Sequence, residues 1–212
     1  MILINTIQKP VSFEQIINKS RFIAYLYPVD NVEEAMAILG QIRKKHYDAN
    51  HNCYSYIIGI DNLTAKSSDD GEPSQTAGVV IFEVLKKNNL TNVLAIVTRY
   101  FGGIKLGAGG LIRAYGSSVS EALKIAEILK IEKLLTAEII TDYSYINIIQ
   151  RLLENYEIIE RNFAVKALLK IRMPEAEFKN LKEALIEVSK GNVEITVLKT
   201  EMAPTSEIET KN

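Results

Sequence analysis

The chain is poor in the features that mark secreted and membrane proteins, and Cys53 is its only cysteine. A single cysteine cannot form a disulfide within the chain, so a reducing compartment is the simplest assignment. The first ten residues already include Asn5, Gln8 and Lys9, which argues against a signal peptide. No apolar run reaches the length of about 18 residues that spans a bilayer. We therefore expect a cytoplasmic protein with no membrane segment.

An excess of charge of either sign is also missing, since the net charge is −1. Residues 1–132 carry 14 basic and 13 acidic side chains, and the remainder carries 11 and 13. Neither part is a polycation, so long-range attraction to nucleic acid is not available. Any contact with RNA or a nucleotide must come from a local cluster of cations.

Complete motifs for the common cofactor and metal sites are absent. The glycines at 102–110 lack the third glycine of G-x-G-x-x-G, and no Gly-Lys-Ser/Thr follows, so neither a Rossmann site nor a P-loop is predicted. His46, His51 and Cys53 are unevenly spaced without a fourth partner, which falls short of a structural zinc pattern. A thiol nucleophile at Cys53 is an alternative, but a cysteine in a strand is usually a small core residue. We predict no bound cofactor or metal.

The acidic loop that contains Asp69, Asp70 and Glu72 allows two interpretations. Its carboxylates could hold Mg²⁺ beside a phosphate. The same stretch also has the composition of a turn followed by a helix that Ser74 caps. We favour the turn and helix start, because the sequence does not place the other ligands that Mg²⁺ needs.

The most informative feature is a strand that runs into a glycine-rich turn and then into an amphipathic helix. The glycines are Gly102, Gly103, Gly107, Gly109 and Gly110. They permit positive φ angles and close approach of a ligand, and the first N–H groups of the helix lie at the positive end of its dipole. Arg99, Lys105 and Arg113 add cations. This glycine turn (residues 102–113) predicts an anion site, with phosphate as the best ligand. The alternative is that the glycines only let the helix pack closely on the strand.

Hydrophobic periodicity predicts an α+β fold with two domains and a polar tail. In the first domain, residues 1–132, strands are expected at 19–29, 52–60, 63–67 and 93–97, and helices after Asp30 or Asn31, from Ser74 or Thr76, and at 111–129. The second domain, residues 133–200, reads as strand, helix, strand, strand, helix and strand, which is the ferredoxin-like βαββαβ order. Residues 201–212 are polar and expected to fray.

Three stretches resemble the IMPACT family, whose bacterial members are called YigZ-like. They are TRYFGGIKLGAGGLIRAYG at 98–116, SSDDGEPSQTAG at 67–78 and HNCYSY at 51–56. The resemblance implies a first domain with the fold of a domain of a small-subunit ribosomal protein, and a second domain similar to one from a ribosomal elongation factor. It also implies that residues of these motifs wall the site at the glycine turn, namely His51, Asp70, Glu72 and Tyr100.

The same resemblance implies a link with translation and its regulation, through RNA or ribosome contact. Our leading hypothesis is a non-enzymatic protein that binds RNA, or another phosphate-bearing ligand, at the glycine turn. An Mg²⁺-dependent enzyme acting on a phosphorylated small molecule is the second hypothesis, and a protein-interaction adaptor with a purely structural turn is the third. Eukaryotic relatives use an added N-terminal domain in stress-kinase signalling, and we do not expect that role here. The oligomeric state stays open.

Overall fold

The computed structural model describes residues 4–60 and 63–205, which divide into two compact units. The first unit comprises residues 1–130 and the second residues 131–212. Both contain helices and sheet, so the predicted α+β class and two-domain architecture are confirmed. Among the described residues, no helix has the length and apolar character needed to cross a membrane.

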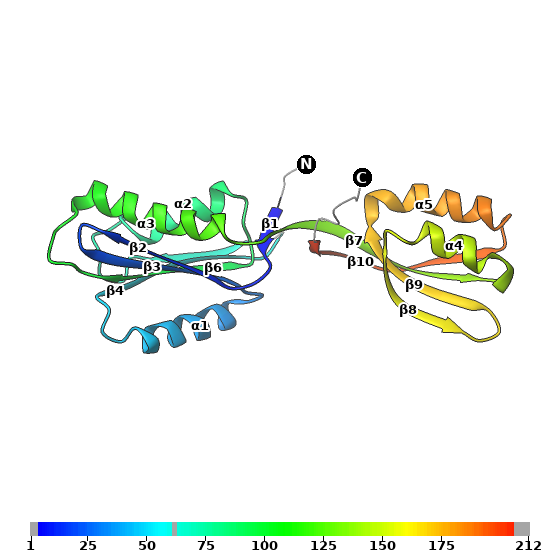
Figure 1. The fold of residues 1–212 in the computed structure, drawn as a ribbon, viewed down its shortest axis with the longest axis horizontal. Coiled ribbons are helices and arrows are strands. Elements are labelled where there is room, and N and C mark those ends of the chain that lie inside the picture. The colour runs from blue at the N-terminus through cyan, green and yellow to red at the C-terminus, as the bar shows by residue number, and fades with distance from the viewer. Residues whose placement is uncertain (1–3, 61–62, 206–212) are drawn as a thin grey trace. The chain divides into compact units, whose positions relative to one another are not determined.

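The first unit is built on an antiparallel sheet with the strand order β2-β3-β6-β4-β5 (Figure 1). The strands of this sheet are β2 (Val11–Ile17), β3 (Ser20–Pro28), β4 (His51–Ile58), β5 (Thr64–Ser68) and β6 (Val93–Tyr100), and the unit also contains β1 (Ile4–Ile7) outside the sheet. Its helices are α1 (Val32–Lys45), α2 (Gly78–Lys87) and α3 (Gly107–Lys124). The short strand β1 joins this unit through Asn5, whose N–H and carbonyl bond Asn89 and Thr91.

Helices cover both faces of this sheet, with α2 and α3 on one face and α1 on the other (Figure 1). Side chains of β6 alternate between the two cores, because successive residues of a strand point to opposite faces. Val93, Ala95 and Val97 pack under α2 and α3, whereas Leu94 and Ile96 pack under α1. Every inward position of this strand is therefore expected to be apolar, and Arg99 at its end departs from that rule.

Local sequence signals were accurate for most of the first unit. Asn31 caps α1, since its Oδ1 accepts the Glu34 N–H at 2.8 Å. The hairpin of β4 and β5 is antiparallel as predicted, and the turn expected at residues 61–62 lies outside the described residues.

Three element assignments in the first unit were wrong or missing. Strands β1 and β2 were not predicted, although β2 forms one edge of the sheet. Helix α3 begins four residues before the predicted start at Leu111 and ends at Lys124, because Leu129 belongs to the next strand rather than to the helix.

The second unit has the predicted βαββαβ order. Its elements are β7 (Ile128–Thr141), α4 (Ile146–Leu152), β8 (Glu157–Phe163), β9 (Ala167–Pro174), α5 (Glu175–Val188) and β10 (Val193–Thr205), with a short 3₁₀ turn at Tyr143–Tyr145 before α4. Strand β7 lies between β10 and β9, and β8 is at the edge. Both helices pack on one face of this sheet (Figure 1). Residues 201–205 continue β10 instead of fraying, and residues 206–212 lie outside the described residues.

Candidate anion-binding site at the start of helix α3

The glycine turn connects the end of β6 to α3 and is anchored at its entry by two hydrogen bonds. The Phe101 N–H donates to Asn50 Oδ1 at 2.7 Å, and the Gly102 N–H donates to Ser20 Oγ at 3.2 Å. A Cβ on Gly102 would lie 2.0 Å from the carbonyl carbon and oxygen of Lys19. Gly102 therefore serves close backbone packing, and its amide is already used within the fold.

The remaining glycines divide into two groups. Gly103 and Gly107 have φ angles of +83° and +68°, and nothing lies within 4 Å of a Cβ added at either position. Gly110 packs against Leu106, whose Cβ would be 2.9 Å from an added Cβ. Gly109 is within α3 and is not among the glycines with positive φ, so the conformational freedom of glycine is not used at this position. Only Gly103 and Gly107 combine the positive φ with open space.

The N-terminus of α3 has no side-chain cap. Leu106 occupies the N-cap position, no side chain there bonds the helix, and the first turn contains no acidic residue. The first N–H groups of a helix have no partner within the helix, so those of Gly107, Ala108 and Gly109 are available to a ligand. They also lie at the positive end of the helix dipole.

Two of the three predicted cations lie at this terminus. Lys105 and Arg113 are exposed, and neither has an ion pair or a side-chain hydrogen bond within residues 4–60 and 63–205. Arg113 Nη1 lies 3.8 Å from the position that a Cβ on Gly109 would take, so its guanidinium folds back over the first turn of the helix. These cations and the uncapped amides give the turn the character of an anion site.

The third predicted cation, Arg99, is not available to a surface ligand. It is only 5% exposed, and its Nη1 donates to Glu72 Oε1 at 2.6 Å. Its guanidinium carbon lies 5.3 Å from the ring centre of Phe22 and 5.5 Å from that of Phe101. The buried carboxylate neutralises Arg99, because an unpaired charge inside the fold would be very costly. The expectation that Arg99 contacts phosphate therefore needs correction.

Glu72, predicted as part of the site wall, is instead the centre of a buried network. Its Oε1 also accepts the Tyr115 hydroxyl at 2.7 Å, and its Oε2 lies 3.9 Å from His51 Nε2. Cys53 Sγ is 3.4 Å from the Tyr115 hydroxyl and donates to the Asp69 carbonyl at 2.9 Å. Burial raises the pKa of the Cys53 thiol to about 12. A thiolate nucleophile is thus strongly disfavoured at neutral pH.

The other acidic residues of the loop have structural partners as well. Asp69 caps α2, since its Oδ1 accepts the N–H groups of Ala77 and Gly78 at 3.0 and 2.8 Å. This replaces the predicted cap at Ser74. Asp70 accepts from Arg43 Nη2 at 2.7 Å and from the Asn52 N–H at 2.7 Å.

The carboxylates of Asp69 and Asp70 thus have partners within the fold, as a turn followed by a helix start requires. Within the part of the chain that the structure describes, no group of three or more His, Cys, Asp or Glu side chains could hold a metal ion.

Tyr100, the last predicted wall residue, belongs to a different cluster on the α1 face. His46 lies between two hydroxyls, with Nδ1 2.8 Å from Tyr100 and Nε2 2.7 Å from Tyr25. Tyr100 donates onward to Asp48 Oδ1 at 3.1 Å. Burial, assisted by the positive charges of Lys45 and Arg21, lowers the pKa of His46. A neutral imidazole satisfies this chain, because it has one N–H donor and one acceptor nitrogen.

Sequence reasoning missed the pairing of Arg99 with Glu72, although a signal for it was present. In β6, Arg99 follows Val93, Ala95 and Val97 at a spacing of two, which places it on the face that α2 and α3 cover. A cation at such a position requires a buried acidic partner. Alternation thus predicts that Arg99 is buried, but it does not say which carboxylate pairs with it.

Comparisons with known proteins cover both units. A family profile described as the Impact N-terminal domain matches residues 18–123, and one described as a domain of unknown function (DUF1949) matches residues 139–192. The chain is 40% identical over 192 residues to the IMPACT family member YvyE of Bacillus subtilis, covering 90% of this chain and 88% of that protein. It is 33% identical over 193 residues to the IMPACT family member YigZ of Escherichia coli, covering 89% and 95%.

One solved structure resembles this chain over nearly the full length of both proteins. The crystal structure of a hypothetical protein has a TM-score of 0.60 and 32% identity, and the match covers 94% of this chain and 98% of that one. A lower-scoring neighbour, with a TM-score of 0.36 and 26% identity over 57% of this chain and 47% of its own, is described as the two-domain translational regulator Yih1. That likeness is too weak to carry anything over to this chain.

Proposed function

The chain belongs to the IMPACT family, and we propose that it is a non-enzymatic, translation-associated regulatory protein that binds RNA, free or in the ribosome, through phosphate contacts at the glycine turn. The translation link rests on the family resemblance of the three motifs. The contact itself is proposed from the chemistry of the turn.

The observation that carries the proposal is the uncapped start of α3 beside two unpaired cations. Lys105 and Arg113 are exposed, and the N–H groups of Gly107, Ala108 and Gly109 have no partner within the helix. Backbone donors at a helix terminus and a guanidinium fork both suit phosphate oxygens. Because Arg99 is neutralised by Glu72, two side-chain phosphate contacts are expected rather than three.

The test is binding of a short single-stranded RNA to the full chain and to the double variant Lys105→Ala/Arg113→Ala, measured over a range of salt concentrations. The variant should bind at least tenfold more weakly, since each charge-assisted contact is worth about 1.5–3 kcal/mol. The slope of the logarithm of the binding constant against the logarithm of the salt concentration should be less steep by about 1.4, because each phosphate contact to a single strand contributes about 0.7 to that slope.

A matched control removes the same charge elsewhere on the first unit. Lys44 and Lys87 are exposed lysines at the ends of α1 and α2. The variant Lys44→Ala/Lys87→Ala should retain nearly all of the binding and the salt slope. Equal loss in both double variants would mean that only net charge matters and would remove the turn as the site.

The two other hypotheses have outcomes of their own in the same preparation. Mg²⁺-dependent turnover of a phosphorylated small molecule would replace the proposal with the enzyme. Absence of RNA binding at low salt, together with capture of a partner protein that survives the double variant, would favour the adaptor.

A further inference from the structure

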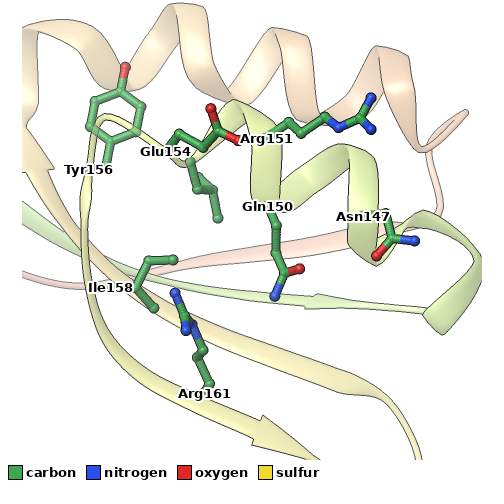
Figure 2. Close-up of a pocket in the computed structure, with 8 residues that line it drawn as sticks. Asn147, Gln150, Arg151, Glu154, Tyr156, Ile158 and Arg161 are labelled. Carbon is green, nitrogen blue, oxygen red and sulfur yellow. The ribbon is translucent and has the colours of Figure 1, made fainter.

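The second unit contains a groove between α4 and the edge strand β8 (Figure 2), and no residue of the glycine turn lines it. Its volume is about 650 Å³, which is within the range of small-ligand sites. Gln150 on α4 and Arg161 on β8 point toward each other across it, and Asn147 lies at one end (Figure 2). We call this the α4/β8 groove.

A β-bulge turns Arg161 into this groove. Ile158 pairs with Ile171 and Glu160 pairs with Lys170, so the strand carries one extra residue between them. As a result, Arg161 lies opposite Leu169, whose side chain is in the core beneath the helices. In a regular strand, Glu160 would face the helices instead. Bulges are common beside binding sites, where they re-aim a side chain.

Arg161 differs from the charged residues on the other face of the same strand pair. There, Glu160 pairs with Lys170 at 2.6 Å and Glu157 lies 4.0 Å from Arg172. Arg161 has no ion pair or side-chain hydrogen bond within the described residues. The groove therefore presents an unpaired guanidinium, which suits a phosphate or carboxylate bidentately.

The other groups of the groove narrow the ligand class. The amides of Gln150 and Asn147 each offer a donor and an acceptor, as the edge of a nucleobase requires. Glu154 offers a carboxylate, which suits ribose hydroxyls, and the partly buried Ile158 adds apolar surface for a flat ring. An added peptide strand is disfavoured, because a bulge and an inward charge both protect an edge strand from pairing.

We infer that the α4/β8 groove binds a nucleoside phosphate, either as a free nucleotide or as one unit of an RNA strand. Arg161 holds the phosphate, and Gln150 contacts the base. This inference does not rest on the glycine turn, because the two sites share no residue.

The experiment follows backbone amide NMR shifts of the full chain during titration with the four nucleoside 5′-monophosphates, with inorganic phosphate and with a short single-stranded RNA. Shifts in α4 and β8 with free nucleotides support the inference and identify the ligand as a free nucleotide. Shifts there with RNA alone also support it and identify the ligand as one unit of an RNA strand. No shift in α4 or β8 with any of these probes at millimolar concentration overturns it.

Variants assign the roles. Arg161→Gln should weaken nucleotide binding about tenfold or more through loss of a charge-assisted contact, while thermal unfolding stays unchanged because the residue is exposed. Gln150→Leu should weaken nucleotides but leave inorganic phosphate unaffected. The control Lys182→Ala, an exposed cation on α5 outside the groove, should bind like the unmodified chain. If Arg161→Gln binds like this control, Arg161 serves only to protect the strand edge and the inference fails.

The same titration on Lys105→Ala/Arg113→Ala separates this inference from the proposed function. Shifts in α4 and β8 should persist in that variant, whatever happens at the glycine turn.

Discussion

Replacing Glu72 by Gln should destabilise the first unit far more than the loss of a surface ion pair would. Gln keeps the size of the side chain and an oxygen that can accept from Arg99 and Tyr115, so packing is preserved. What is lost is the negative charge that neutralises Arg99. The Arg99 side chain is 6% exposed and that of Glu72 is 3% exposed, so water cannot stabilise the charge of Arg99 in place of the lost carboxylate.

The expected cost follows from the burial of Arg99. Removing one partner of a buried ion pair typically costs about 3–5 kcal/mol, because the other charge stays buried and uncompensated. The lower end is appropriate here, since the amide oxygen of Gln and Ser20 Oγ, at 3.4 Å from Arg99 Nη2, still accept hydrogen bonds. The free energy of unfolding decreases by about 1.5 kcal/mol per M of urea, so a loss of about 3 kcal/mol lowers the urea concentration at the unfolding midpoint by about 2 M.

Urea unfolding followed residue by residue is the suitable assay. The chain has no tryptophan, and its two units can unfold separately, so a single optical signal would mix them. Amide NMR signals of Ile96 in β6 report on the first unit, and those of Leu169 in β9 report on the second. In Glu72→Gln, only the urea midpoint reported by the amide signals of the first unit should decrease.

The control is Glu14→Gln, which removes the same charge from a surface pair of good geometry. Glu14 accepts two hydrogen bonds of 2.8 Å from Arg21, and both side chains are nearly half exposed. Exposed pairs contribute little because water and salt screen them. The reasoning would be refuted if the two variants lowered the midpoint equally, or if Glu72→Gln lowered it by less than about 0.5 M.

Two further predictions concern stability of the same unit. Gly102→Ala should lower the free energy of unfolding by about 3 kcal/mol or more, since the added Cβ would lie 2.0 Å from the Lys19 carbonyl and the backbone must move. The control is Gly40→Ala in α1, where nothing lies within 4 Å of the added Cβ. This control should be neutral or stabilising by about 0.5–1 kcal/mol in thermal unfolding. For His46, whose pKa is lowered by burial from 6.5, the unfolded chain takes up a proton at higher pH than the folded chain does. The free energy of unfolding should therefore fall as the pH drops below about 6.5. In His46→Gln that part of the pH dependence should be lost, as measured by urea unfolding at several pH values. An identical change of unfolding free energy with pH in the two proteins would contradict the prediction.

Much of the fold could be predicted because its signals are local. The alternation in β3, the continuous apolar run of β6 and the cap at Asn31 depend on residues within a few positions of each other. Strand β2 was not predicted because the polar Gln15 occupies an inward position and Ile16 an exposed one, so the apolar alternation of the sequence stops after Glu14. The start of α3 was placed late because glycines are poor helix formers, and tertiary packing overrides that preference here.

The candidate site could be predicted only in part. Lys105 and Arg113 lie close to the start of α3, and this closeness follows from their short separation in the sequence. The roles of Arg99, Glu72 and Asp70 could not be predicted, since each depends on a partner far away in the sequence.

The sequence by itself determined most of the order of strands and helices, the two-domain architecture and the glycine-rich entry to α3, because short-range periodicity and backbone preference decide these. The tertiary structure alone decided which charges meet. Folding brings Glu72 beside Arg99, and a bulge turns Arg161 toward α4. The physical reason is that a charge finds its partner through the register and packing of distant segments, and no local pattern encodes those distances.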